Sequence, residues 1–171
     1  MTQEPLTLYK LIILYMLDRV TFPLTKAQVC DFILEKEYTN FLTLQQATAE
    51  LIDAELITAN TSRNRTYLEI TAEGRETLSF FRNRINNSIR KDIDVFLNEH
   101  ELEMRNEVSI LADYYKSTSG EYEAHLQAKE KGVTVIELTL SVPDEDTASA
   151  ICANWQKKNQ DIYQYLIRQL F

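Results

Sequence analysis

Apolar residues recur with a helical period through the first half of the chain and with a strand period in part of the second half. Residues 6–20 are apolar on most faces, which predicts a helix in the middle of a small bundle. Pro23 breaks this helix. Two further helices are expected over 25–36 and 43–55, because each stretch opens on a threonine with a glutamine three residues later. This spacing predicts capping boxes, in which both side chains satisfy free backbone amides.

A hairpin is expected directly after these helices. Residues 56–59 and 65–70 read as two short strands, and the polar residues 60–64 between them predict a turn with its tip near Ser62. Thr71 is placed to cap the next helix. On the third helix, the face expected to be buried consists of Leu44, Ala47, Leu51 and Ile52. Three helices followed by a β-hairpin are the elements of a winged helix-turn-helix.

The helical pattern then continues from 71 to about 106 without a proline or an internal breaker. Its apolar stripe, from Leu78 to Met104 and including Ile89, Ile93 and Phe96, is longer than we expect one winged helix to cover. We therefore expect either the second half of the chain or a second copy of the protein to pack against it. The stripe predicts a long linking helix and favours a homodimer.

After residue 106 the period changes from 3.6 to 2, which predicts three strands over about 108–114, 122–128 and 134–142. The acidic residues 144–146 then open a last helix. The expected fold class is α+β. It has an N-terminal winged helix-turn-helix, a long linking helix, and a C-terminal three-stranded antiparallel sheet with one long helix. The expected domains are 1–75, 76–106 for linking and dimerisation, and 107–171 for dimerisation or effector binding.

The 171 residues carry 18 basic and 26 acidic side chains, a formal net charge of −8, so the whole molecule does not attract a polyanion. Residues 60–91 are locally basic, with seven cations and three anions. Cys30 and Cys152 stand in no metal or redox spacing, which is typical of thiols in a reducing compartment. The apolar run 11–17 is too short to span a bilayer, so we expect a cytoplasmic protein without a membrane partner.

The hairpin region resembles a known family. Leu56-Ile57, followed by Arg65-Thr66-Tyr67-Leu68-Glu69-Ile70 and Thr71-Ala72-Glu73-Gly74-Arg75, is similar to the wing and post-wing signature of winged-helix regulators of the PadR and MarR groups. The resemblance covers about residues 6–80. The whole chain also resembles a bacterial family of winged-helix proteins with no assigned function, which implies a fold and a size but no activity.

The resemblance implies that helix 43–55 enters the major groove of double-stranded DNA and that the wing, around residues 60–66, reaches phosphate or the minor groove. The implied DNA-binding residues are Thr43, Gln45, Gln46, Ala49, Arg63 and Arg65. The chain departs from a usual recognition helix because this one lacks Lys and Arg and carries Glu50 and Asp53. Phosphate contacts would then come from the basic stretch 60–91.

No nucleophile, base or metal-ligand constellation is recognisable, so we expect no enzyme, no metal and no cofactor. The leading interpretation is a homodimeric transcriptional regulator. The alternative is a winged helix that serves as a protein-protein interaction module without binding DNA, which the net charge of −8 favours. A third interpretation is a sensor whose C-terminal half, rich in tyrosine, binds a small-molecule effector of unknown identity.

Overall fold

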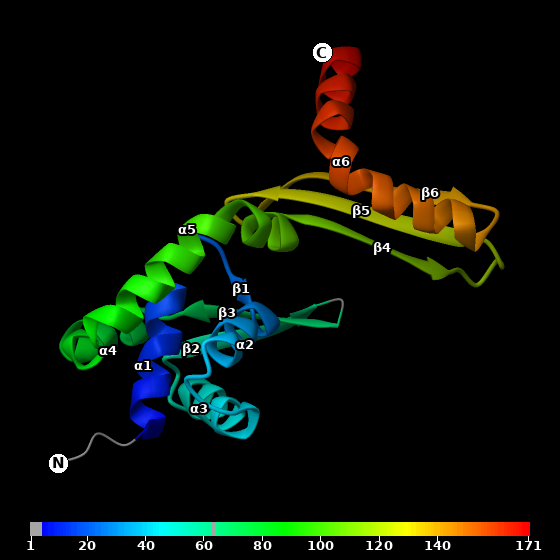
Figure 1. The fold of residues 1–171 in the computed structure, drawn as a ribbon. Coiled ribbons are helices and arrows are strands. Elements are labelled where there is room, and N and C mark those ends of the chain that lie inside the picture. Colours follow the sequence, from blue (N-terminus) through cyan, green and yellow to red (C-terminus); the bar gives the residue numbers. More distant parts are fainter. Residues whose placement is uncertain (1–4, 63) are drawn as a thin grey trace. The chain divides into compact units, whose positions relative to one another are not determined.

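The computed structural model describes residues 5–62 and 64–171. The chain divides into two compact units, Met1–Met104 and Arg105–Phe171. Each unit contains a three-stranded antiparallel sheet together with helices, which confirms the expected α+β fold (Figure 1). The boundary between the units falls within one helix, so this helix contributes residues to both.

The first unit follows the element order of a winged helix. Its β1 (Leu24–Thr25) and β2 (Ile57–Ser62) both pair with β3 (Arg65–Ile70) in a sheet ordered β1-β3-β2, and Ser62 pairs with Arg65 at the turn of the β2–β3 hairpin. The hairpin therefore lies where the alternation of residues predicted it. The elements are α1 (Pro5–Asp18), β1 (Leu24–Thr25), α2 (Lys26–Glu35), α3 (Phe41–Asp53), β2 (Ile57–Ser62), β3 (Arg65–Ile70), α4 (Ala72–Phe81), the 3-10 helix η1 (Arg82–Arg84) and α5 (Asn87–Ser109).

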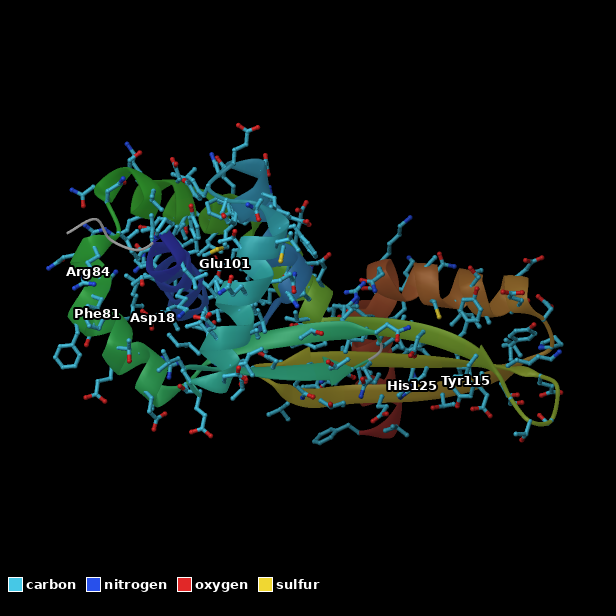
Figure 2. All side chains as sticks on the ribbon, turned by 90° about the horizontal axis from the view of Figure 1, so that it is seen from below. Asp18, Phe81, Arg84, Glu101, Tyr115 and His125 are labelled. Atoms are coloured by element: carbon cyan, nitrogen blue, oxygen red, sulfur yellow. The ribbon has the colours of Figure 1, made fainter. Side chains whose placement is uncertain are left out.

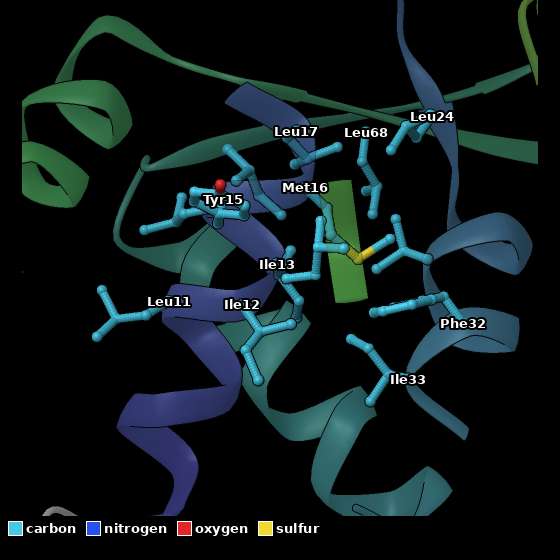
Figure 3. Packing of buried hydrophobic residues seen from close by; sticks show 14 of the residues in the cluster. Leu11, Ile12, Ile13, Tyr15, Met16, Leu17, Leu24, Phe32, Ile33 and Leu68 are labelled. Atoms are coloured by element: carbon cyan, nitrogen blue, oxygen red, sulfur yellow. The ribbon is translucent and has the colours of Figure 1, made fainter. Parts of the chain in front are cut away.

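Helix α1 lies at the centre of this unit, as its apolar circumference predicts. Every residue from Leu11 to Leu17 is buried, and side chains of α2 and β3, including Phe32 and Leu68, surround them (Figure 3). Seven consecutive buried residues leave α1 no face for solvent, so the other elements must pack around it on several sides.

The long helix expected over 71–106 is wrong as a continuous element. The chain leaves helical geometry at Ile85, whose φ of −84° and ψ of 120° are extended. Asn86 then accepts a hydrogen bond from the amide of Ile89 at 2.9 Å, as a helix-capping side chain does. The break lets α5 start in a new direction from α4.

This break changes what covers the apolar stripe. Ile85, Ile93, Leu97 and Met104 are all buried within the same core as α1, and Ile89 and Phe96 pack against that core. The winged-helix unit thus covers the stripe itself. The stripe does not need a second copy of the protein for its burial, contrary to the expectation from its length.

The second unit is the predicted meander with one long helix. Its strands β4 (Ile110–Lys116), β5 (Tyr122–Glu130) and β6 (Val133–Val142) pair in sequence order, and α6 (Glu145–Leu170) follows them. Ala124, Leu126 and Ala128 of β5 are buried, while the residues between them are half-buried. The Trp155 indole of α6 is buried and donates to the carbonyl oxygen of Gln127 at 3.0 Å.

The start of β6 corrects one sequence assignment. Ala128 pairs with Ile136 but Lys129 pairs with Thr134, so a bulge at this point adds Val135 to β6. Because cross-strand partners point to the same side, Thr134 shares the side of Lys129 and leaves the apolar face on which we expected it. Val133 takes its place there, opposite Glu130.

Candidate nucleic-acid interface

Helix α2 begins with the predicted capping box. The Thr25 hydroxyl accepts from the Gln28 amide at 3.1 Å, and the Gln28 side chain accepts from the Thr25 amide at 2.8 Å. The Gln28 side-chain nitrogen also lies 3.5 Å from the carbonyl oxygen of Met104 in α5. The cap therefore fixes the first helix of the helix-turn-helix both locally and against the core.

The turn between α2 and α3 is held from the side by α5. Glu37 adopts a left-handed φ of 56°, and the Tyr38 amide donates back to the carbonyl of Ile33 at 3.2 Å. The Tyr38 hydroxyl donates to the Asp92 carboxylate at 2.7 Å. Burial and this carboxylate raise the pKa of Tyr38 well above its ordinary value.

Helix α3 begins earlier than its sequence predicted. Asn40, not Thr43, is the capping residue, because its side chain accepts from the Thr43 amide at 2.9 Å. The capping box expected at Thr43 is therefore wrong. Asparagine is at least as good a cap as threonine, and starting at Phe41 adds two residues to the helix.

The buried face of α3 differs from the prediction at two positions, Thr48 and Ile52. Leu44, Ala47 and Leu51 are buried as expected, but Thr48 is buried as well, with its hydroxyl bonded to the Leu44 carbonyl oxygen at 2.9 Å. Ile52, which we expected in the core, is exposed. The back-bonded hydroxyl explains how a polar residue is tolerated in this position.

The residues assigned to DNA lie on the remaining faces of α3. Gln46 and Ala49 are exposed, and Thr43 and Gln45 are half-buried. Two apolar side chains, Phe41 and Leu42, are also exposed at the start of the helix. Sequence reasoning missed this pair, because it placed the beginning of the helix after them.

The acidic residues of α3 are in different situations. The Lys10 ammonium of α1 forms an ion pair with Glu50, and the Gln46 side chain donates to Glu50 at 3.1 Å. Lys10 and then Gln46 hold the pKa of Glu50 below its ordinary value. Asp53, in the last turn, is exposed. Lys10 thus offsets one of the two charges that oppose phosphate on this helix.

The wing is a two-stranded ribbon exposed over most of its length. In β2 only Ile57 is buried and Thr58–Ser62 are exposed, and Arg65 at the start of β3 is exposed too. Asn64 adopts a left-handed φ of 62°, which suits the tight turn. Arg63, which the resemblance assigned to DNA, lies outside the described residues.

The residues behind the wing explain its Ile-Thr-x-x-Gly signature physically. The Thr71 hydroxyl accepts from the Gly74 amide at 3.0 Å and lies 2.8 Å from the carbonyl oxygen of Glu55. A Cβ on Gly74 would stand 2.1 Å from the carbonyl oxygen of Leu56, so only glycine fits. The motif therefore joins the end of α3 to α4.

Three of the cations after the wing contact other side chains of the first unit. Arg75 pairs with Asp18 at 3.5 Å, the Arg82 guanidinium lies over the Tyr15 ring, and the Arg84 guanidinium lies over the Phe81 ring (Figure 2). Figure 1 places α4 on the other side of α1 from the wing turn. Arg75, Arg82 and Arg84 thus have partners within the first unit, while the contribution of the basic stretch 60–91 to phosphate contacts stays a prediction.

The described residues outside the winged helix add little site chemistry. Asp144 caps α6 by accepting from the Thr147 amide at 2.8 Å, and these hydrogen bonds lower its pKa. This confirms the capping interpretation of the acidic residues at 144–146. Within 5–62 and 64–171, no group of His, Cys, Asp and Glu is arranged to hold a metal ion, and no helix is both long and apolar enough to cross a bilayer.

The fold is α+β, with a helical unit that carries a β-hairpin, followed by a β-β-β-α unit. The chain belongs to the family described as a domain of unknown function, DUF4364, whose model matches residues 9–170. The match spans both units. Neither the curated proteins nor the solved structures gave a match to this chain.

Proposed function

We propose that this protein is a homodimeric, cytoplasmic transcriptional regulator of the PadR/MarR-like winged-helix kind. Helix α3 enters the major groove of double-stranded DNA, and the wing around residues 60–66 contacts the backbone or the minor groove. The observation that carries the proposal is that the rest of the first unit leaves both elements uncovered. On α3 the outward residues are Gln46 and Ala49, and on the wing all of Thr58–Ser62 is exposed.

The charge distribution limits where phosphate contacts come from. Residues 1–104 contain eleven basic and sixteen acidic side chains, so the first unit is itself acidic. Arg63 and Arg65 of the wing are the cations that we assign to phosphate. Lys10 supports this assignment indirectly, because its ion pair with Glu50 reduces repulsion beside α3.

A second copy is proposed to bind through the end of α6. The stripe that packs on the sheet, including Cys152, Trp155 and Ile162, continues as Leu166 and Leu170, while Figure 1 shows the last part of α6 turning away from the sheet. Leu170 is 83% exposed, and neighbouring Ile167 is 48% exposed. By helical period Asp161 and Arg168 lie on the opposite side, so the stripe carries no charge.

A second apolar surface is the best cover for an uncharged apolar stripe. In a two-fold dimer, the same stripe of the second copy provides this surface. The segment holds aliphatic side chains together with Tyr163 and Tyr165. Aromatic side chains cover about 150–250 Å² each when buried.

The test of DNA binding is an electrophoretic mobility shift of genomic DNA fragments from the source organism, repeated at low and high salt. The proposal expects a shift that weakens steeply with salt and that survives competition by unrelated DNA for some fragments. No shift of any fragment at low salt would exclude the proposal.

The exposed Phe41 and Leu42 favour a second candidate, a winged helix that binds a protein partner. Exposed apolar side chains on a helix without cations are typical of protein interfaces. The same experiment separates the two candidates, because a protein-binding module leaves the DNA fragments unshifted at every salt concentration.

A further inference from the structure

We infer that α3 reads A·T-rich DNA in the major groove, with Gln45 recognising adenine and Leu42 and Ala49 contacting thymine methyl groups. This inference rests on the proposed function and adds to it the class of DNA sequence that the site takes. It follows from the side chains that α3 exposes and from those that it lacks.

The geometry singles out one line of residues on α3. Leu44, Ala47, Thr48 and Leu51 face the core, so at 100° per residue Leu42 and Ala49 point to the opposite side, two turns apart. Leu42 is 79% exposed and Ala49 is exposed. Because Asn40 caps the helix, Leu42 belongs to its first turn. The N-terminal residues of a recognition helix are the ones that contact base edges.

The chemistry of this line matches A·T pairs. Thymine presents a C5-methyl group in the major groove, which apolar side chains contact, and adenine presents N7 and N6, which glutamine binds bidentately. Guanine presents two acceptors that Arg or Lys reads. Helix α3 contains neither Arg nor Lys, so it lacks the side chains that most commonly read guanine.

The two glutamines are not equivalent. Gln46 donates to Glu50, which Lys10 holds in an ion pair, so the Gln46 amide is oriented by its neighbours. Gln45 stands on the side of Leu42 and Ala49 away from Glu50. We therefore assign adenine recognition to Gln45. A free Glu50 carboxylate could accept from the amino group of cytosine, but this carboxylate is already bound by Lys10 and Gln46.

The experiment compares three probes for the wild-type protein by fluorescence anisotropy at one low salt concentration. These are poly(dA-dT), poly(dG-dC), and the A·T polymer with every thymine replaced by uracil, which removes the methyl groups alone. We expect binding to favour the A·T polymer over the G·C polymer, and the uracil polymer to lose about fourfold in affinity per methyl in contact.

Two variants assign the effect to residues. Gln45→Ala is expected to reduce the preference for A·T by about 5- to 100-fold. Leu42→Ala is expected to lower the ratio of thymine-polymer to uracil-polymer affinity by about fourfold, because Ala49 keeps its own methyl contact. Glu55→Ala, at an exposed position beyond the last turn of α3, is the matched control and leaves both ratios unchanged.

Each outcome decides a separate point. Salt-sensitive binding with equal or greater affinity for the G·C polymer would overturn the A·T inference and leave the proposed function standing. Equal affinity for thymine and uracil polymers would overturn the assignment of Leu42 and Ala49. Absence of binding to every polymer and to genomic fragments would remove the proposed function itself. The wild-type comparisons do not depend on the folding of any variant.

Discussion

The carbonyl oxygen of Leu56 lies 2.1 Å from the position that a Cβ on Gly74 would occupy. Leu56 follows α3 and Gly74 is in the first turn of α4, so this contact sets how closely the two helices approach at the base of the wing. The Thr71 amide donates to the same carbonyl at 3.1 Å, which fixes the oxygen in place.

Replacing this glycine tests the junction. Gly74→Ala is expected to lower the free energy of unfolding by roughly 1–3 kcal/mol, because the carbonyl that the methyl group meets is backbone and cannot move aside cheaply. Urea denaturation measures it. Glu76→Ala, on an exposed position of the same helix, is the control and is expected to change stability by less than about 0.5 kcal/mol. Equal stability of Gly74→Ala and the wild type would show that α4 can shift freely.

The Tyr38–Asp92 hydrogen bond predicts a loss of stability at alkaline pH. The native state raises the pKa of Tyr38, so above about pH 10 the unfolded chain has lost a proton that the native protein retains. The contribution of this hydrogen bond to the free energy of unfolding is full below the pKa that Tyr38 has in the unfolded chain. It declines as the pH rises above that value, by up to about 1.4 kcal/mol per pH unit.

Tyr38→Phe isolates this contribution. The variant is expected to be about 1.5–3 kcal/mol less stable than the wild type near pH 8, since a hydrogen bond to a carboxylate is lost. The difference should shrink towards pH 11, as followed by urea unfolding at a series of pH values. Tyr165→Phe, on an exposed part of α6, serves as the control. A difference that stays constant with pH would contradict the predicted linkage.

The wing can be tested separately from the cations of α4 and η1. Replacing Arg63 and Arg65 together with alanine is expected to weaken DNA binding and to flatten the dependence of log affinity on log salt by up to about two charges per copy. Arg84→Ala, whose guanidinium lies over Phe81, is expected to change neither quantity. The reverse result, with Arg84 important and the wing without effect, would place the phosphate backbone at η1.

The proposed dimer surface predicts the mass of the protein in solution. Sedimentation at micromolar concentration is expected to give about twice the 19.9 kDa of one chain. Leu166→Glu combined with Leu170→Glu should give single chains, because two charges would be buried in an apolar pairing. Gln164→Glu, on the polar side of α6, should remain dimeric. A wild-type protein that sediments as one chain would exclude this surface and weaken the regulator proposal.

The elements of the first unit could largely be predicted, because local signals specify them. The Thr25–Gln28 capping box and the alternation in 65–70 act over three to six residues, and both are present in the structure. The start of α3 was missed since Asn40 and Thr43 are both good caps. The choice between these two caps depends on whether Phe41 and Leu42 have a lower free energy in the helix or in the preceding turn. No local sequence pattern predicts this.

The break before α5 and the bulge in β6 depend on tertiary structure. No proline or glycine marks the break at Ile85, which is buried in the core, and the Asn86 side chain caps the helix that follows. The bulge at Ala128 and Lys129 shifts the register without any change in composition. At the candidate site, the exposed positions on α3 follow from helical period. The pairing of Glu50 with Lys10 does not, because forty residues separate the two.

The position of α5 also restricts the order in which the chain folds. Tyr15 bonds to Asp94 across 79 residues, and Gln28 reaches Met104 across 76. The ends of these contacts are synthesised far apart in time, and closing such long loops slows folding. A nascent chain that ends at the wing therefore still exposes the apolar side chains of α1. Until α5 emerges, this nascent chain presents the exposed apolar surface that chaperones recognise. A fragment that ends at residue 75 would keep that apolar surface exposed permanently.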